Sequence, residues 1–126
     1  MKTRPLMLSL GVLAVLAAPG ALHAQKLTTG TWTGTVAPPD ADAIPATFAV
    51  SMSGDTTRIM VTVEPGSFPF YDVKVLADRI TFWFEPGDAH VNCTLMLGEL
   101  GVFKGDCVDS DGGTGVITMV PPKKEG

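Results

Sequence analysis

The feature that most constrains this chain is an alternation of apolar and polar residues that runs from residue 30 to residue 120. Such alternation places successive side chains on opposite faces of a strand. Gly, Pro and Asp interrupt it about every ten residues, which is typical of turns between short antiparallel strands. We therefore predict an all-β fold, an antiparallel meander that closes into a barrel, with a β-sandwich as the alternative. The eight predicted strands are residues 30–36, 47–53, 58–63, 71–75, 80–84, 91–97, 102–108 and 114–120.

Residues 1–24 read as a secretory signal peptide. A basic start containing Lys2 and Arg4 precedes an apolar stretch at 6–18, and small residues lead to a cleavage point before Gln25. The apolar stretch is short for a transmembrane helix, so we expect no membrane span. The sequence thus predicts a secreted or periplasmic protein whose single β domain is residues 25–126.

The charge balance disfavours nucleic acid and anionic lipid as partners. Removing residues 1–24 takes away two of the nine basic side chains and none of the 13 acidic ones, which leaves a mature net charge of −6. No Lys/Arg cluster is present in the sequence. Binding to phosphate backbones requires such basic groups. We expect a monomer whose partner is a small apolar molecule or another exported protein.

The two cysteines, Cys93 and Cys107, are expected to form a structural disulfide. An oxidising compartment favours the bond, and their spacing is not that of a C-x-x-C redox motif. Their midpoint falls at residue 100, inside a Gly-flanked turn. Folding a hairpin about that turn sets Cys93 opposite Cys107 and Leu97 opposite Phe103, so the register accounts for the spacing.

Two proline-containing segments, residues 37–45 and 65–69, are predicted to be loops. Proline cannot donate a hydrogen bond to a sheet ladder, so neither segment suits a central strand. The first is long enough to cover the mouth of a barrel.

The sequence offers little that could perform catalysis. His90 is the only histidine after residue 24, and we interpret it as a solvated loop residue because a zinc site would need more nitrogen, sulfur or carboxylate ligands nearby. No G-x-S-x-G motif is present. Residues 109–113 resemble a calcium loop only in part and predict a hairpin turn, and the Asn92–Thr94 sequon falls inside a strand. We therefore predict no enzyme activity, no metal site and no cofactor.

The two faces of the predicted strands suggest two candidate sites. The apolar face would form the core, with a possible ligand pocket near Trp32, Phe48 and Tyr71. An eight-stranded barrel can be filled by side chains or hold one small ligand, and the many bulky residues favour filling. On the opposite, wet face, Phe70 and Trp83 form a candidate aromatic patch for binding another protein.

The motif Gly30-x-Trp32 in the first strand resembles the calycin group, which includes lipocalins and avidins. In that group a Trp in the first strand often closes the barrel floor. The chain departs from the lipocalin pattern in two respects, because it has no helix near its end and no Arg in its last strand. Residues 29–34 and 117–122 are also similar to small secreted bacterial proteins, a resemblance that implies no mechanism.

Two functions follow as hypotheses. In the first, the barrel mouth or interior binds a small apolar molecule. In the second, the protein is an interaction module, or resembles a protease inhibitor, and uses Phe70, Trp83 or the loop of residues 37–45 against another exported protein. A cavity larger than about 300 Å³ that is open at one end would favour the first hypothesis, and a dry filled core would favour the second.

Overall fold

The computed structural model describes residues 27–123, so the predicted signal peptide lies outside the described residues. Within this range there is no helix long and apolar enough to cross a membrane. The chain forms nine strands and one short 3-10 turn, η1 (Glu99–Gly101). The strands are β1 (Gly30–Ala37), β2 (Ile44–Ser53), β3 (Thr56–Val63), β4 (Gly66–Pro69), β5 (Tyr71–Val75), β6 (Arg79–Phe84), β7 (Val91–Leu97), β8 (Phe103–Asp109) and β9 (Thr114–Val120).

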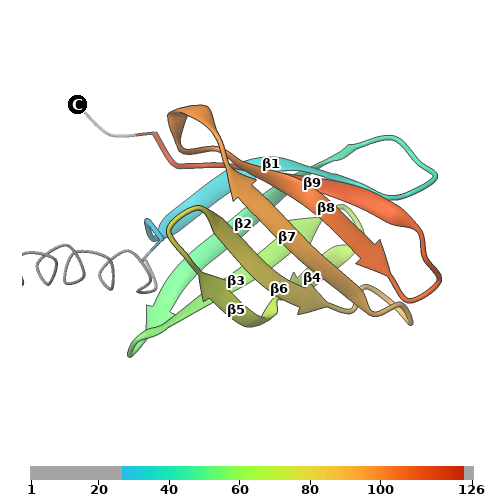
Figure 1. Ribbon diagram of the computed structural model, residues 1–126, viewed down its shortest axis with the longest axis horizontal. Helices are drawn as coiled ribbons and strands as arrows, with labels where there is room; N and C mark the ends of the chain where they lie inside the picture. The colour runs from blue at the N-terminus through green and yellow to red at the C-terminus, as the bar shows by residue number, and fades with distance from the viewer. Residues whose placement is uncertain (1–26, 124–126) are drawn as a thin grey trace, which may run out of the picture.

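All nine strands belong to one antiparallel sheet in the order β4-β3-β2-β1-β9-β8-β7-β6-β5. The sheet curls into a nearly closed barrel, which confirms the predicted fold class (Figure 1). β3 and β5 lie side by side across the remaining gap without a ladder between them. Between β4 and β5, the amide of Phe70 donates to the Ile59 carbonyl at 2.9 Å. We call this junction of β3, β4 and β5 the seam.

The count of eight strands was one too low because residues 66–69 form β4 instead of a loop. β4 is a four-residue strand at the edge of the sheet, where Pro69 lies opposite Met60. An edge strand tolerates proline because one side of its backbone needs no ladder partner. Pro45 lies near the start of β2. The ladder between β2 and β3 begins at Thr47, so Pro45 needs no hydrogen-bond partner on that side.

The β7–β8 hairpin has the predicted register. Cys93 lies opposite Cys107, Leu95 opposite Gly105 and Leu97 opposite Phe103. The two cysteines form a disulfide with a Cα–Cα distance of 4.1 Å. The spacing of the cysteines about the turn was therefore sufficient to predict this part of the fold.

The β5–β6 hairpin differs from the prediction because β5 contains a bulge. Val75 pairs with Ile80 as expected, but Tyr71 pairs with Trp83 and not with Phe84, and the register shifts between Tyr71 and Lys74. Asp72, inside the bulge, has φ = 54°, a left-handed conformation that Asp tolerates better than most residues. The extra residue turns Tyr71 to the outside and leaves its side chain 43% exposed.

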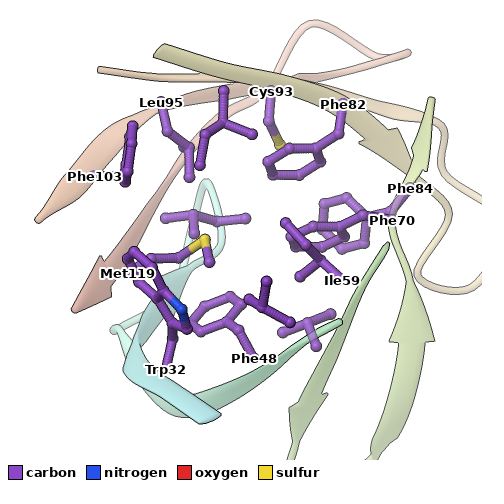
Figure 2. Close-up of a cluster of buried hydrophobic side chains, with 14 of the residues drawn as sticks. Trp32, Phe48, Ile59, Phe70, Phe82, Phe84, Cys93, Leu95, Phe103 and Met119 are labelled. Atoms are coloured by element: carbon purple, nitrogen blue, oxygen red, sulfur yellow. The ribbon is translucent and has the colours of Figure 1, made fainter. Parts of the chain in front are cut away.

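The middle of the barrel is filled by inward-pointing side chains from every long strand (Figure 2). Phe48, Ile80, Leu95 and Met119 are completely buried. Phe70 is also buried, so its predicted exposure was wrong. Its ring stacks on Phe82 at a centroid distance of 3.8 Å and fills the interior beside the seam.

Two glycines allow the backbones of neighbouring strands to approach closely. A Cβ at Gly34 would overlap the Thr118 carbonyl oxygen, and a Cβ at Gly105 would overlap that of Thr94. Glycine permits such close approach where a barrel turns a corner. Any other residue at these two positions would require the neighbouring backbone to shift.

Candidate functional site

The most developed concave site is an apolar pocket at one end of the barrel, which we call the mouth. Four segments surround it, namely residues 38–43, 64–65, 85–90 and 109–113. These mouth segments gather at the right-hand end of Figure 1, away from both ends of the described chain. The pocket has a volume of about 440 Å³, within the range of roughly 300–1,000 Å³ typical of small-molecule sites.

The floor of the pocket is the end of the filled core that faces the mouth. It is formed by the buried residues Val61, Phe84, Val91 and Ile117. Half-buried residues of the strand ends form its sides, and the mouth segments add prolines to its rim. Among the described residues that line the pocket, Asp109 alone has a charged side chain. The other lining residues are Val36, Ala37, Pro38, Pro39, Ile44, Val63, Pro65, Phe68, Pro86, Ala89, Cys107, Gly113, Gly115 and Val116.

The local sequence explains why the rim is rigid. Pro38, Pro39, Pro65 and Pro86 fix φ in three of the four mouth segments. In the fourth, the Asp109 carboxylate accepts hydrogen bonds from the amides of Asp111 and Gly113, at 2.9 and 2.8 Å. Residues 109–113 therefore form a hydrogen-bonded hairpin turn, as predicted. These prolines and hydrogen bonds restrict the backbone of the rim.

A second hollow lies at the opposite end, which we call the base. It has a volume of about 340 Å³ and is lined partly by Leu27, Trp32, Ala77 and Phe103. Trp32 is only 2% exposed, and its indole Nε1 donates to the Thr28 carbonyl at 2.8 Å. The Trp thus closes the base of the barrel, with its ring 6.1 Å from that of Phe103.

The structure does not bring the predicted ligand residues together. Trp32 lies at the base, Phe48 lies in the filled middle, and Tyr71 lies on the outer surface. None of the three lines the mouth pocket. The useful sequence signal was the proline-rich segment 37–45, which was expected to cover a barrel mouth and does contribute Pro38 and Pro39 to the rim.

The outer aromatic group also differs from the predicted pair. Trp83 stacks on Tyr71 at 4.4 Å and on His90 at 4.7 Å, measured between ring centroids. His90 also contacts Glu85, with 3.2 Å between Nδ1 and Oε2. His90 is therefore half-buried and stacked on Trp83, and the Trp83 ring has two aromatic neighbours. Phe70 takes no part in this group because it is buried.

Within residues 27–123, no group of three or more His, Cys, Asp or Glu side chains is placed to hold a metal ion.

The comparisons with known proteins support the fold. Neither a protein-family model nor a curated protein sequence matches the chain. Among solved structures, the redesigned beta barrel b11L5F_LGL has a TM-score of 0.57 and 19% identity over 75% of this chain and 91% of its own. The redesigned beta barrel mFAP1, bound to DFHBI, has a TM-score of 0.56 and 16% identity over 74% of this chain and 94% of its own. The protein therefore belongs structurally to the small β-barrels, and its resemblance to lipocalins is not confirmed.

Proposed function

We propose that the protein is an exported, non-catalytic binding module that takes a small apolar molecule into the mouth pocket. The observation that carries this proposal is a pocket of about 440 Å³ whose walls are apolar except for Asp109. The signal-peptide pattern of residues 1–24 supports export. A barrel of similar fold, mFAP1, has been solved with the small molecule DFHBI bound.

The mouth pocket favours this function over binding another protein through Phe70 and Trp83. Phe70 is 6% exposed and stacked against Phe82, so it cannot anchor a partner without opening the core. Trp83 already stacks with Tyr71 and with His90. Desolvated aromatic faces give protein interfaces most of their energy, and this stacking leaves less of the Trp83 ring for a partner.

The test uses N-phenyl-1-naphthylamine, a neutral apolar dye whose fluorescence rises on leaving water. We expect the mature protein to bind it saturably at one site. Three substitutions then locate the site by filling space with the same side chain: Ala89→Trp at the mouth, Ala77→Trp at the base hollow, and Ala49→Trp on the exposed face of β2.

Only Ala89→Trp should weaken dye binding, by tenfold or more, while all three variants keep the wild-type circular dichroism spectrum. Absence of saturable dye binding to the wild-type protein would overturn the proposal. So would a loss of binding in Ala77→Trp with Ala89→Trp unaffected, because the base hollow would then be the site.

A further inference from the structure

We propose that the ligand of the mouth pocket is an organic cation, a molecule with an apolar body and an ammonium-type group. This inference rests on the proposed function and adds the charge of the ligand to it. The pocket is the site, and the charges around its opening determine which apolar molecules it favours.

The mouth segments carry a strongly one-sided charge. They contain seven carboxylates and no Lys or Arg. Among the described residues there, Glu85 Oε2 lies 3.2 Å from His90 Nδ1, a contact within the rim itself. The seven acidic residues of the mouth segments are Asp40, Asp42, Glu64, Glu85, Asp88, Asp109 and Asp111.

The rest of the described chain is balanced. Outside the mouth segments, residues 27–123 contain five acidic and five basic side chains. Two of these acids form ion pairs with neighbouring bases, Asp72 with Lys74 at 3.4 Å and Asp78 with Arg79 at 2.9 Å. The negative charge of the described domain is therefore concentrated at one end, around the pocket.

Asp109 lines the pocket, and the other six carboxylates do not line it but lie within two residues of a residue that does. Asp40 follows the lining residue Pro39, Glu64 precedes Pro65, and Asp88 precedes Ala89. These three acids are exposed, so their carboxyl groups face water beside the pocket. A cation bound with its apolar body in the pocket would place its charged end near them, whereas the charged end of an anion would be repelled by them.

The arrangement suits a diffuse organic charge better than a metal ion. Among the described residues no three acidic or histidine side chains converge as metal ligands. A ring of separated charges around a low-dielectric cleft instead produces a focused field that attracts cations over a distance of about one Debye length, roughly 8–10 Å at physiological salt. The attraction therefore depends on salt, which provides a test.

The experiment displaces N-phenyl-1-naphthylamine from the mature protein with three molecules that share a ten-carbon chain: decyltrimethylammonium, decanol and decyl sulfate, all below micelle-forming concentrations. At about 10 mM ionic strength we expect the ammonium compound to displace the dye at least tenfold more effectively than the sulfate, with the alcohol between them. At about 0.5 M NaCl the difference should fall to threefold or less, because the Debye length shrinks to a few ångströms.

A matched pair of triple variants assigns the preference to the mouth. Asp40→Asn/Glu64→Gln/Asp88→Asn removes three exposed charges at the mouth, and Asp55→Asn/Glu99→Gln/Asp106→Asn removes three exposed charges elsewhere. Both change the net charge by the same amount. The first should cut the preference for the ammonium compound over the sulfate at least threefold with dye affinity unchanged, and the second should leave the preference close to wild type.

The outcomes separate this inference from the proposed function. Dye binding at the mouth with equal displacement by all three compounds would overturn the cation preference and leave the apolar pocket standing. Equal effects of the two triple variants would show that net charge, and not the mouth, sets the preference, which also overturns it. Failure of the dye to bind would overturn the proposed function first.

Discussion

The two ends of the barrel differ in how they are built. The base is closed by one large side chain, Trp32, which is 2% exposed, and the described residues outside the mouth segments carry balanced charge. The mouth has no such plug, and its prolines and hydrogen-bonded turn hold a pocket open beneath a ring of carboxylates. A barrel with a filled middle therefore still has room for a pocket at one end. Under the proposed function, the base contributes stability and the mouth binds the ligand.

The largest expected effect tests the base. Trp32→Ala should lower the free energy of unfolding by about 3–5 kcal/mol, because it removes a buried aromatic ring and leaves a cavity. Chemical denaturation measures the loss, and Trp32→Phe should recover part of it. A loss below about 1 kcal/mol would mean that the base is not closed by this residue, and the contrast between the two ends would fail.

The matching substitution at the mouth is Phe68→Ala. Phe68 lines the pocket and is only partly buried, so its removal should cost about 1–2 kcal/mol, less than half the cost at the base. The same variant should bind N-phenyl-1-naphthylamine at least threefold more weakly. If stability falls as far as in Trp32→Ala, the mouth carries as much of the core as the base does.

A smaller effect, of opposite sign, is expected in the turn at the base between β7 and β8. Leu100 is 91% exposed and adopts φ = 60°, a conformation that costs a β-carbon-bearing residue roughly 1–2 kcal/mol relative to glycine. Leu100→Gly should therefore stabilise the protein by up to about 1 kcal/mol, since part of the gain is lost to the greater freedom of glycine in the unfolded chain. A destabilised variant would indicate that the leucine side chain has a contact that holds the turn.

The smallest effect concerns an exposed charge pair at the base. Hydrogen bonding from the Arg79 guanidinium lowers the pKa of Asp78 below its ordinary value. A carboxyl group whose pKa is lower in the folded state stabilises that state above its unfolded pKa, and the stabilisation disappears as the pH falls through the lowered value.

The variant Asp78→Asn should therefore melt slightly below the wild type at pH 7, and the two melting temperatures should converge as the pH falls below the ordinary pKa of an aspartate. Because both side chains are exposed, the difference at pH 7 should be close to the limit of detection. A larger difference at low pH than at neutral pH would contradict the assigned direction.

How well the sequence predicted the structure depended on how local the deciding interactions were. In the β7–β8 hairpin, Cys93 and Cys107 are equally spaced about one turn, so local geometry determined the register. At the start of β5, the adjacent aromatics Phe70 and Tyr71 could not both face inward, and alternation favoured Tyr71. In the structure Phe70 faces inward, and its ring fills the interior beside the seam. The seam forms only when the first and last thirds of the sheet meet, so a pattern along one strand cannot predict it.

The mouth pocket was predictable only in outline for the same reason. Its walls combine residues such as Pro38, Pro65, Pro86 and Gly113, which are far apart in the chain and meet only through closure of the barrel. Period-2 alternation describes the faces of single strands and carries no information on how loops converge. A sequence signal was nevertheless present, because prolines and acidic residues recur together in three of these loops, as in Pro39–Asp40, Glu64–Pro65 and Glu85–Pro86.

The seam also has a kinetic consequence. All neighbouring strands around the barrel are joined by ladders except β3 and β5, which meet at the seam. β5 therefore has a ladder only with β6, and the bulge at Asp72 interrupts that ladder. Segments with fewer hydrogen bonds open locally at a lower free energy than the whole fold. We therefore expect the β5 amides to exchange with deuterated water orders of magnitude faster than those of β7 and β8. A barrel that opens locally along this one line can adjust its circumference while the disulfide-linked β7–β8 pair stays intact.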